Sequence, residues 1–295
     1  MSASLEVRTY GRDAKPRMGF FTDTSVCIGC KACEVACKEW NDVPDTIGEF
    51  TGHSYDQTVA LGADTWRHVA FIEQRVPTGV EAAADSLVEA AERNALAQDG
   101  VPTHQEGDGV RWLMSSDVCK HCTHAACLEV CPTGALFRTE FGTVVVQQDV
   151  CNGCGYCVPA CPFGVLDRRE GDGRVWKCTL CYDRLKDDME PACAQACPTD
   201  SIQFGELDEL RERADRRLAK VAGAGRDEAR LYLRDDDGVG GGGAFFLLLD
   251  EPEAYGLPPA PVDTTRDLGS IWAATGAAAA ALAATIVLAS LGRRR

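Results

Sequence analysis

The chain has 295 residues, with 45 acidic against 30 basic side chains and a formal net charge of −15. This charge argues against a nucleic-acid partner, because a surface that binds phosphate is basic. The length allows a hydrophobic core in one or two domains, so the 16 cysteines are not needed as the disulfide framework of a small, core-poor fold.

The N-terminal part contains the first of four cysteine runs, with Cys27, Cys30, Cys33 and Cys37. Residues 1–18 precede it as a polar arm without the apolar stretch of a secretory signal, and we expect this arm to lie on a partner. A short helix is predicted over residues 34–40, and alternating apolar positions predict a strand over residues 65–76. Residues 78–109 are an acidic, alanine-rich excursion, for which we predict a surface helix or partial order and no chemistry.

The other three cysteine runs follow in close succession, and each ends in Cys-Pro. They contain Cys119, Cys122, Cys127 and Cys131; Cys151, Cys154, Cys157 and Cys161; and Cys178, Cys181, Cys193 and Cys197. Between the first two of these runs, residues 135–138 and 143–146 flank Gly142 and predict a β-hairpin. A strand-like segment at residues 201–204 follows the last run in the same way, which indicates an internal repeat.

The spacing of the run from Cys151 to Cys161 is that of bacterial ferredoxins, which bind [4Fe–4S] clusters. Three closely spaced cysteines wrap around one cluster, and the fourth usually reaches a neighbouring cluster, while the proline after it turns the chain away. A zinc ribbon would stop at paired Cys-x2-Cys steps, and a Rieske centre would replace two cysteines by histidines. We therefore predict that all 16 cysteines bind iron–sulfur clusters and that His121 and His124 are ordinary loop residues.

The ferredoxin crossover gives, by analogy, four ligand sets, one for each of four predicted [4Fe–4S] clusters. Set 1 is Cys27, Cys30, Cys33 and Cys197; set 2 is Cys37, Cys178, Cys181 and Cys193; set 3 is Cys119, Cys122, Cys127 and Cys161; set 4 is Cys131, Cys151, Cys154 and Cys157. The predicted fold is α+β, with two ferredoxin-like units in a four-cluster domain over residues 19–204. One unit combines residues 27–37 with residues 178–197, and the other spans residues 119–161.

The C-terminal part begins with an extension and connector over residues 205–263, for which we predict a charged surface helix that ends near Gly223 and a short buried strand over residues 244–249. Residues 271–291 contain no charged side chain and, as a helix, are about 30 Å long, which predicts a single transmembrane span; a buried helix of a soluble protein is the alternative. Three arginines follow at once, residues 293–295. The positive-inside rule then places the C-terminus in the cytoplasm and the cluster domain outside, with the cytoplasmic face as the alternative.

The chain resembles the iron–sulfur (beta) subunit of membrane-bound respiratory formate dehydrogenase. The resemblance is carried by CIGCKACEVACKEWNDVPDTIG (27–48), CNGCGYCVPACPFGV (151–165), VWKCTLCYDRL and PACAQACPT (within 175–199), the later LYLRDDDGVGG and YGLP, and the single C-terminal helix. The cysteine runs alone are shared by many four-cluster subunits of molybdenum and tungsten oxidoreductases. The Glu-Trp-Asn-Asp sequence after the first run and the helical tail favour formate dehydrogenase.

The resemblance implies a membrane complex in which this chain transfers electrons and is not itself a catalyst. A molybdopterin or tungstopterin catalytic subunit would oxidise formate, and a membrane cytochrome b-type subunit would pass the electrons to quinone. The chain also lacks a Ser/His/Asp set, a phosphate loop and a dinucleotide motif. The alternatives are the equivalent subunit of a hydrogenase or of a polysulfide or sulfoxide reductase, and a stand-alone membrane-anchored redox protein. Lys31, Lys38 and Lys177 lie next to predicted ligands and could raise the potentials of nearby clusters by their charge, but we expect each to face solvent.

Overall fold

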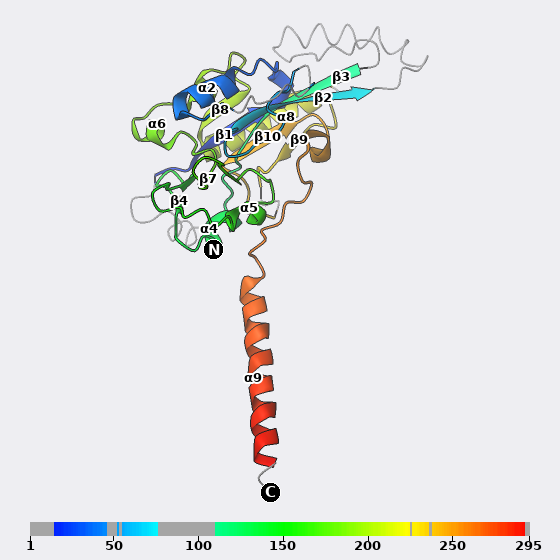
Figure 1. Ribbon diagram of the computed structural model, residues 1–295. Helices are drawn as coiled ribbons and strands as arrows, with labels where there is room; N and C mark the ends of the chain where they lie inside the picture. The colour runs from blue at the N-terminus through cyan, green and yellow to red at the C-terminus, as the bar shows by residue number, and fades with distance from the viewer. Residues whose placement is uncertain are drawn as a thin grey trace.

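The computed structural model describes residues 15–45, 52, 55–75, 110–224, 226–235 and 238–292. The predicted excursion over residues 78–109 and the first 14 residues of the predicted arm lie outside these ranges. Figure 1 shows a mixed α+β body from which the last helix extends alone. The predicted α+β class is confirmed.

A four-stranded sheet lies at the centre of the body, in the order β8-β1-β10-β9. β1 (Met18–Asp23) is antiparallel to β8 (Ile202–Glu206) and parallel to β10 (Ala244–Leu248), and β9 (Arg230–Tyr232) completes the far edge. All five residues of β10 are buried, which confirms the buried strand predicted there. A strand covered on both faces has no polar side to alternate with, and the sequence AFFLL fits that position.

The helix α8 (Leu207–Ala222) packs against β1 and β8. It buries Leu207, Leu210, Ala214 and Val221, which recur at intervals of three, four and seven residues and therefore lie on one face. The remaining face is charged and exposed, as predicted, and the helix ends at Gly223. The helix thus covers the central sheet on one side and meets solvent on the other.

Short antiparallel strand pairs bring distant cysteines to the same place. In the β1–β8 pair Thr22 lies opposite Ile202, so Cys27, which follows β1, and Cys197, which precedes β8, are at one end of the sheet. The predicted hairpin is confirmed as β4 (Leu136–Arg138) and β5 (Val144–Val146), with Gly142 at a φ of +75°. It places the cysteine before β4 beside the run that follows β5. A third pair, β6 (Asp167–Arg168) with β7 (Val175–Trp176), returns the chain to the last cysteine run.

A longer two-stranded ladder, β2 (Arg67–Arg75) with β3 (Val110–Val118), lies alongside the cysteine loops. β2 confirms the strand predicted over residues 65–76, and α2 (Ala32–Asn41) confirms the helix predicted after the first cysteines. Pairing of Arg67 with Val118 places this arginine next to the start of the second cysteine run. The remaining short helices are η1 (Thr24–Val26), α4 (Ala126–Glu129), α5 (Cys157–Ala160), α6 (Tyr182–Lys186), α7 (Ala192–Gln195) and η2 (Pro252–Tyr255).

The last helix, α9 (Leu268–Gly292), extends away from the body, and its residues through Leu291 are exposed (Figure 1). Within the described residues, Leu268–Leu291 is the one helix long and apolar enough to cross a membrane, with a mean hydropathy of 1.9. None of that apolar window is buried in this chain. The helix is therefore not part of the core of this chain, and α9 is a candidate membrane anchor.

Candidate metal centres

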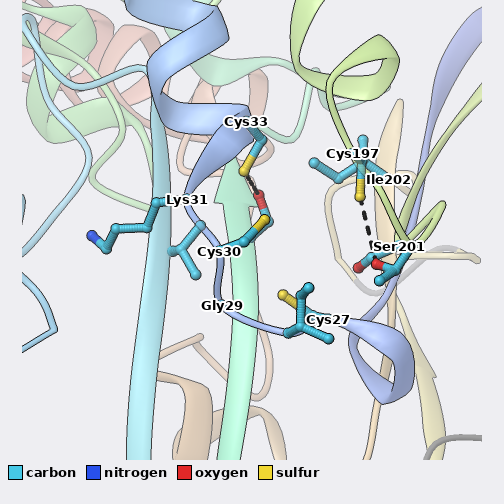
Figure 2. Close-up of a pocket in the computed structure, with 12 residues that line it drawn as sticks. Cys27, Gly29, Cys30, Lys31, Cys33, Cys197, Ser201 and Ile202 are labelled. Atoms are coloured by element: carbon cyan, nitrogen blue, oxygen red, sulfur yellow. Dashed lines mark hydrogen bonds between the residues drawn. The ribbon is translucent and has the colours of Figure 1, made fainter.

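The four cysteines of set 1 face one cavity that contains about 280 Å³ of empty space. Figure 2 shows the side chains of Cys27, Cys30, Cys33 and Cys197 around this cavity. Cys27 and Cys30 lie on the loop before α2, Cys33 is in the first turn of α2, and Cys197 follows α7 in the sequence. Cys33 Sγ shares a hydrogen bond with Ser116 Oγ at 3.2 Å. Burial raises the pKa of the Cys33 thiol to about 12, so a thiolate here requires a positive partner.

Set 4 surrounds a second cavity of similar size, with about 300 Å³ of empty space lined by all four of its cysteines. Burial raises the pKa of the Cys157 thiol to about 11. Cys131 differs: burial raises its pKa, but backbone N–H donors, led by that of Leu136, outweigh burial and lower it. The loop around this set depends on Gly153, whose φ is +72° and whose missing Cβ would lie 2.3 Å from Gly173 O. A side chain at this position would therefore collide with backbone.

Set 2 lies deepest, and all four of its cysteines are buried. Cys37 is on α2, Cys193 is on α7, and Cys178 and Cys181 lie before α6. The pKa of the Cys37 thiol is held well above its ordinary value, first by burial and then by the charges of the three other members of the set. The three thiols that act on Cys37 in this way are its close neighbours, although they come from a segment 140 or more residues away in the sequence.

The cysteines of set 2 also receive hydrogen bonds from the protein. Arg67 Nη2 donates to Cys193 Sγ at 3.1 Å, and the backbone N–H of Leu180 donates to Cys178 Sγ at 3.3 Å. Asn41 Nδ2 lies 3.7 Å from Cys37 Sγ and 3.8 Å from Cys181 Sγ. N–H donors stabilise negative charge on sulfur and orient a ligating thiolate.

Set 3 is assembled from the second run and the last cysteine of the third. The pKa of the Cys122 thiol is well above its ordinary value, first because of burial and then because of the charges of Cys119, Cys161 and Cys127. His121 lies beside this set but accepts a hydrogen bond from the Val144 N–H through Nδ1 at 3.0 Å. Burial, with the nearby cations, keeps the pKa of His121 well below its ordinary value, so the side chain is neutral.

The electrostatic effects of one set on the next indicate that the four ligand sets lie in a line. The charge of Cys193 in set 2 raises the pKa of Cys33 in set 1, after the larger effect of burial. In the same way, after burial, Cys119 of set 3 acts on Cys178 of set 2, and Cys157 of set 4 acts on Cys127 of set 3. The sets therefore follow one another in the order 1, 2, 3, 4. One cysteine at each end of this line is exposed, Cys30 in set 1 and Cys154 in set 4.

The donor sets suit a group larger than one metal ion. Among the described residues, no three Cys, His, Asp or Glu side chains converge closely enough to hold a single ion. A tetrahedral zinc with bonds of about 2.3 Å would draw its sulfurs to about 3.8 Å from one another. Thiols grouped in fours around a cavity need a partner that is positive and several atoms wide, and iron joined by sulfide meets both requirements.

Comparison with known proteins identifies the family of the chain. Residues 26–135 and residues 110–207 each match a family described as a 4Fe-4S dicluster domain. The iron-sulfur subunit of the nitrate-inducible formate dehydrogenase of Escherichia coli K12 is 38% identical over 262 residues, covering 87% of this chain and 78% of that protein. The formate dehydrogenase-O iron-sulfur subunit of the same organism is 36% identical over 293 residues, covering 96% and 87%. The chain is a member of the family of formate dehydrogenase iron–sulfur subunits.

As a formate dehydrogenase iron–sulfur subunit, the chain carries [4Fe–4S] clusters and is not the catalytic subunit. The predicted family is confirmed. A subunit of the anaerobic dimethyl sulfoxide reductase of E. coli K12 is also similar, at 34% identity over 195 residues, but these cover only 66% of this chain and 76% of that protein. The cluster-bearing region is thus shared more widely than the whole chain.

The side chains around the clusters of this formate dehydrogenase subunit differ from the sequence prediction in two respects. Lys177, expected to face solvent, is 2% exposed; its ammonium donates to Val144 O and, at 2.7 Å, to Cys178 O. The expectation failed because the residue lies between β7 and a buried cysteine loop, so its side chain does not reach solvent. Arg67 was not singled out at all. It begins a strand whose alternating pattern carries no sign that its first side chain turns towards sulfur.

Proposed function

We propose that each of the four ligand sets holds one [4Fe–4S] cluster and that this chain relays electrons between a catalytic subunit and a membrane subunit. The observation that carries the proposal is that cysteines from separate runs come together in fours around common cavities, as in sets 1 and 4. The electrostatic effect of each set on the next supports the order 1, 2, 3, 4. When bound, each cluster accepts and returns one electron. A line of four such groups, with an exposed cysteine at either end, would let electrons enter at one end and leave at the other.

The surrounding residues would make each transfer possible without catalysing a reaction. Set 2 lies in the apolar core, which excludes water from the middle of the line. The amide of Asn41 and the backbone N–H of Leu180 stabilise charge on sulfur when an electron arrives. Rigid strand pairs hold the loops of sets 1 and 4, so little rearrangement accompanies electron transfer.

The partners follow from the family. The relatives are named as subunits of formate dehydrogenases, and the alignment with one of them extends over 96% of this chain, compared with 66% for the sulfoxide reductase subunit. We therefore propose a formate-oxidising molybdopterin or tungstopterin subunit as the electron donor and a cytochrome b-type membrane subunit as the acceptor. In the domain division that we propose, residues 19–204 hold the clusters, residues 205–263 form an extension and connector, and residues 271–291 span the membrane.

Interrupting the line at set 2 tests this function. In the purified complex with Cys37→Ser, we expect formate-dependent reduction of a small dye by the catalytic subunit to remain and formate-dependent quinone reduction to be lost. Arg216→Ala, on the exposed face of α8, is the control and should leave both activities unchanged. Quinone reduction that survived Cys37→Ser would mean that electrons bypass this chain. Loss of both activities would mean that the chain serves the catalytic subunit in some other way.

We further propose that the cluster domain lies outside the cytoplasm. Three arginines follow α9, whereas Arg266 is the nearest basic residue before it, and basic flanks stay in the cytoplasm. Protease added to spheroplasts should then digest the cluster domain, and inverted vesicles should protect it. The reverse pattern would place the domain on the cytoplasmic face.

A further inference from the structure

Two buried cations lie at the junctions between ligand sets. Arg67 is 2% exposed; it donates to a sulfur of set 2 and to Ser116, whose hydroxyl contacts a sulfur of set 1. Lys177, equally buried, donates to Cys178 O of set 2 and to Val144 O, and the N–H of Val144 donates to His121, which is next to Cys122 of set 3. Each cation therefore lies near two consecutive sets and not at the edge of one.

The contacts of Arg67 connect the two sets directly. Its Nη2 donates to Cys193 Sγ of set 2 at 3.1 Å, and its Nη1 donates to Ser116 O at 3.2 Å and Ser116 Oγ at 3.4 Å. The same Ser116 hydroxyl shares a hydrogen bond with Cys33 Sγ of set 1. The guanidinium also lies over the ring of Phe20, with its Cζ 4.9 Å from the ring centroid.

Neither cation has a carboxylate among its polar contacts in the described part of the chain. Arg67 meets carbonyl, hydroxyl and sulfur atoms, and its Nε is buried without a hydrogen-bond partner. Lys177 meets two backbone carbonyls. Lys120, by contrast, is as deeply buried but pairs with Asp117. An isolated buried cation is costly, so the negative charge that balances Arg67 and Lys177 has to come from ligated sulfur.

We propose that Arg67 and Lys177 are the counter-charges of the clusters on either side of them and hold the reduction potentials of those clusters above the values that the cysteines alone would give. The inference rests on the proposed function. Reduction adds one negative charge to a site, and a fixed positive charge nearby makes that addition more favourable, the more so in a water-free interior. The cluster of set 2, which lies between both cations, depends on both.

Redox titration of the intact complex, followed by the paramagnetic signals of its clusters, tests the proposal. In Arg67→Gln we expect the ratio of reduced to oxidised cluster, measured at the wild-type midpoint, to fall about tenfold for two of the four clusters, which is a shift of about 59 mV for one electron. Lys177→Gln should shift two clusters, of which one is also shifted by Arg67→Gln. Arg67→Lys keeps the charge and should retain most of the wild-type value.

Arg111→Gln is the matched control, because this arginine is also largely buried, on β3, but contacts Asp250 and Leu249 O instead of sulfur. It should leave all four midpoints unchanged. Iron content is measured on every sample. If Arg67→Gln loses iron, the midpoints of Lys177→Gln provide the test. If variants that keep their iron also keep their wild-type midpoints, the proposal is wrong. A wild-type complex with far fewer than about sixteen iron atoms in this chain would contradict the proposed function instead.

Discussion

Replacing Cys193 and Cys197 together by alanine is expected to remove about eight of about sixteen iron atoms from the chain, although the two residues lie four positions apart on one short run. Cys193 belongs to set 2 and Cys197 to set 1, so the pair of substitutions breaks two clusters. Replacing Cys33 and Cys197, which are far apart in sequence but face the same cavity, should remove only about four. Iron and labile sulfide, measured against protein on anaerobically purified samples, separate these outcomes.

The single substitutions provide the controls. Each should remove about four iron atoms. The Cys33/Cys197 pair should then lose no more iron than either single substitution, whereas the Cys193/Cys197 pair should lose the sum of the two single losses. If instead the Cys193/Cys197 pair lost four atoms, the cluster would be bound by consecutive cysteines of one run, and the crossed arrangement would be wrong. Loss of all iron in every variant would mean that the sets fold as one cooperative unit.

The crossed sets are a prediction by analogy with the ferredoxin crossover, and the members of sets 1 and 4 do line common cavities. In that analogy, three cysteines separated by two residues wrap around one cluster and the fourth reaches the neighbouring cluster, and the hairpin predicted around Gly142 lies between the two central runs. The strand over residues 65–76, the helix after Cys33 and the end of α8 at Gly223 followed from local periodicity and capping. These features depend on near neighbours in the sequence.

Long-range pairing was beyond the reach of such signals. β1 lies parallel to β10, with Phe20 opposite Ala244, and nothing in either segment identifies a partner more than two hundred residues away. The same limit applies to Arg67 and Lys177, since a lone basic residue is most often on the surface. Their burial becomes intelligible only once several ligand sets crowd into one core, because the accumulated negative charge on sulfur then favours cations that the apolar surroundings alone would reject.

Replacing Ala280 by arginine is expected to transfer the full-length chain, produced without its partners, from the membrane to the soluble fraction. Residue 280 lies near the middle of α9, and an arginine at the centre of a transmembrane helix costs about 3 kcal/mol. Since every 1.4 kcal/mol is a factor of ten, the membrane-bound fraction should fall about a hundredfold relative to the soluble one. Carbonate-washed membranes and supernatant, compared by immunoblot, give the ratio.

The alanine-rich composition of α9 is what makes one charge decisive. Alanine contributes little apolar surface, so the helix inserts with a small margin that a single arginine exceeds. Ala280→Leu, at the same position, should hold the chain in the membrane at least as firmly as the wild type. Because α9 buries none of its apolar window in the body, the arginine variant should keep its iron. If it stayed with washed membranes, the body, and not α9, would be the part that attaches this chain to the membrane.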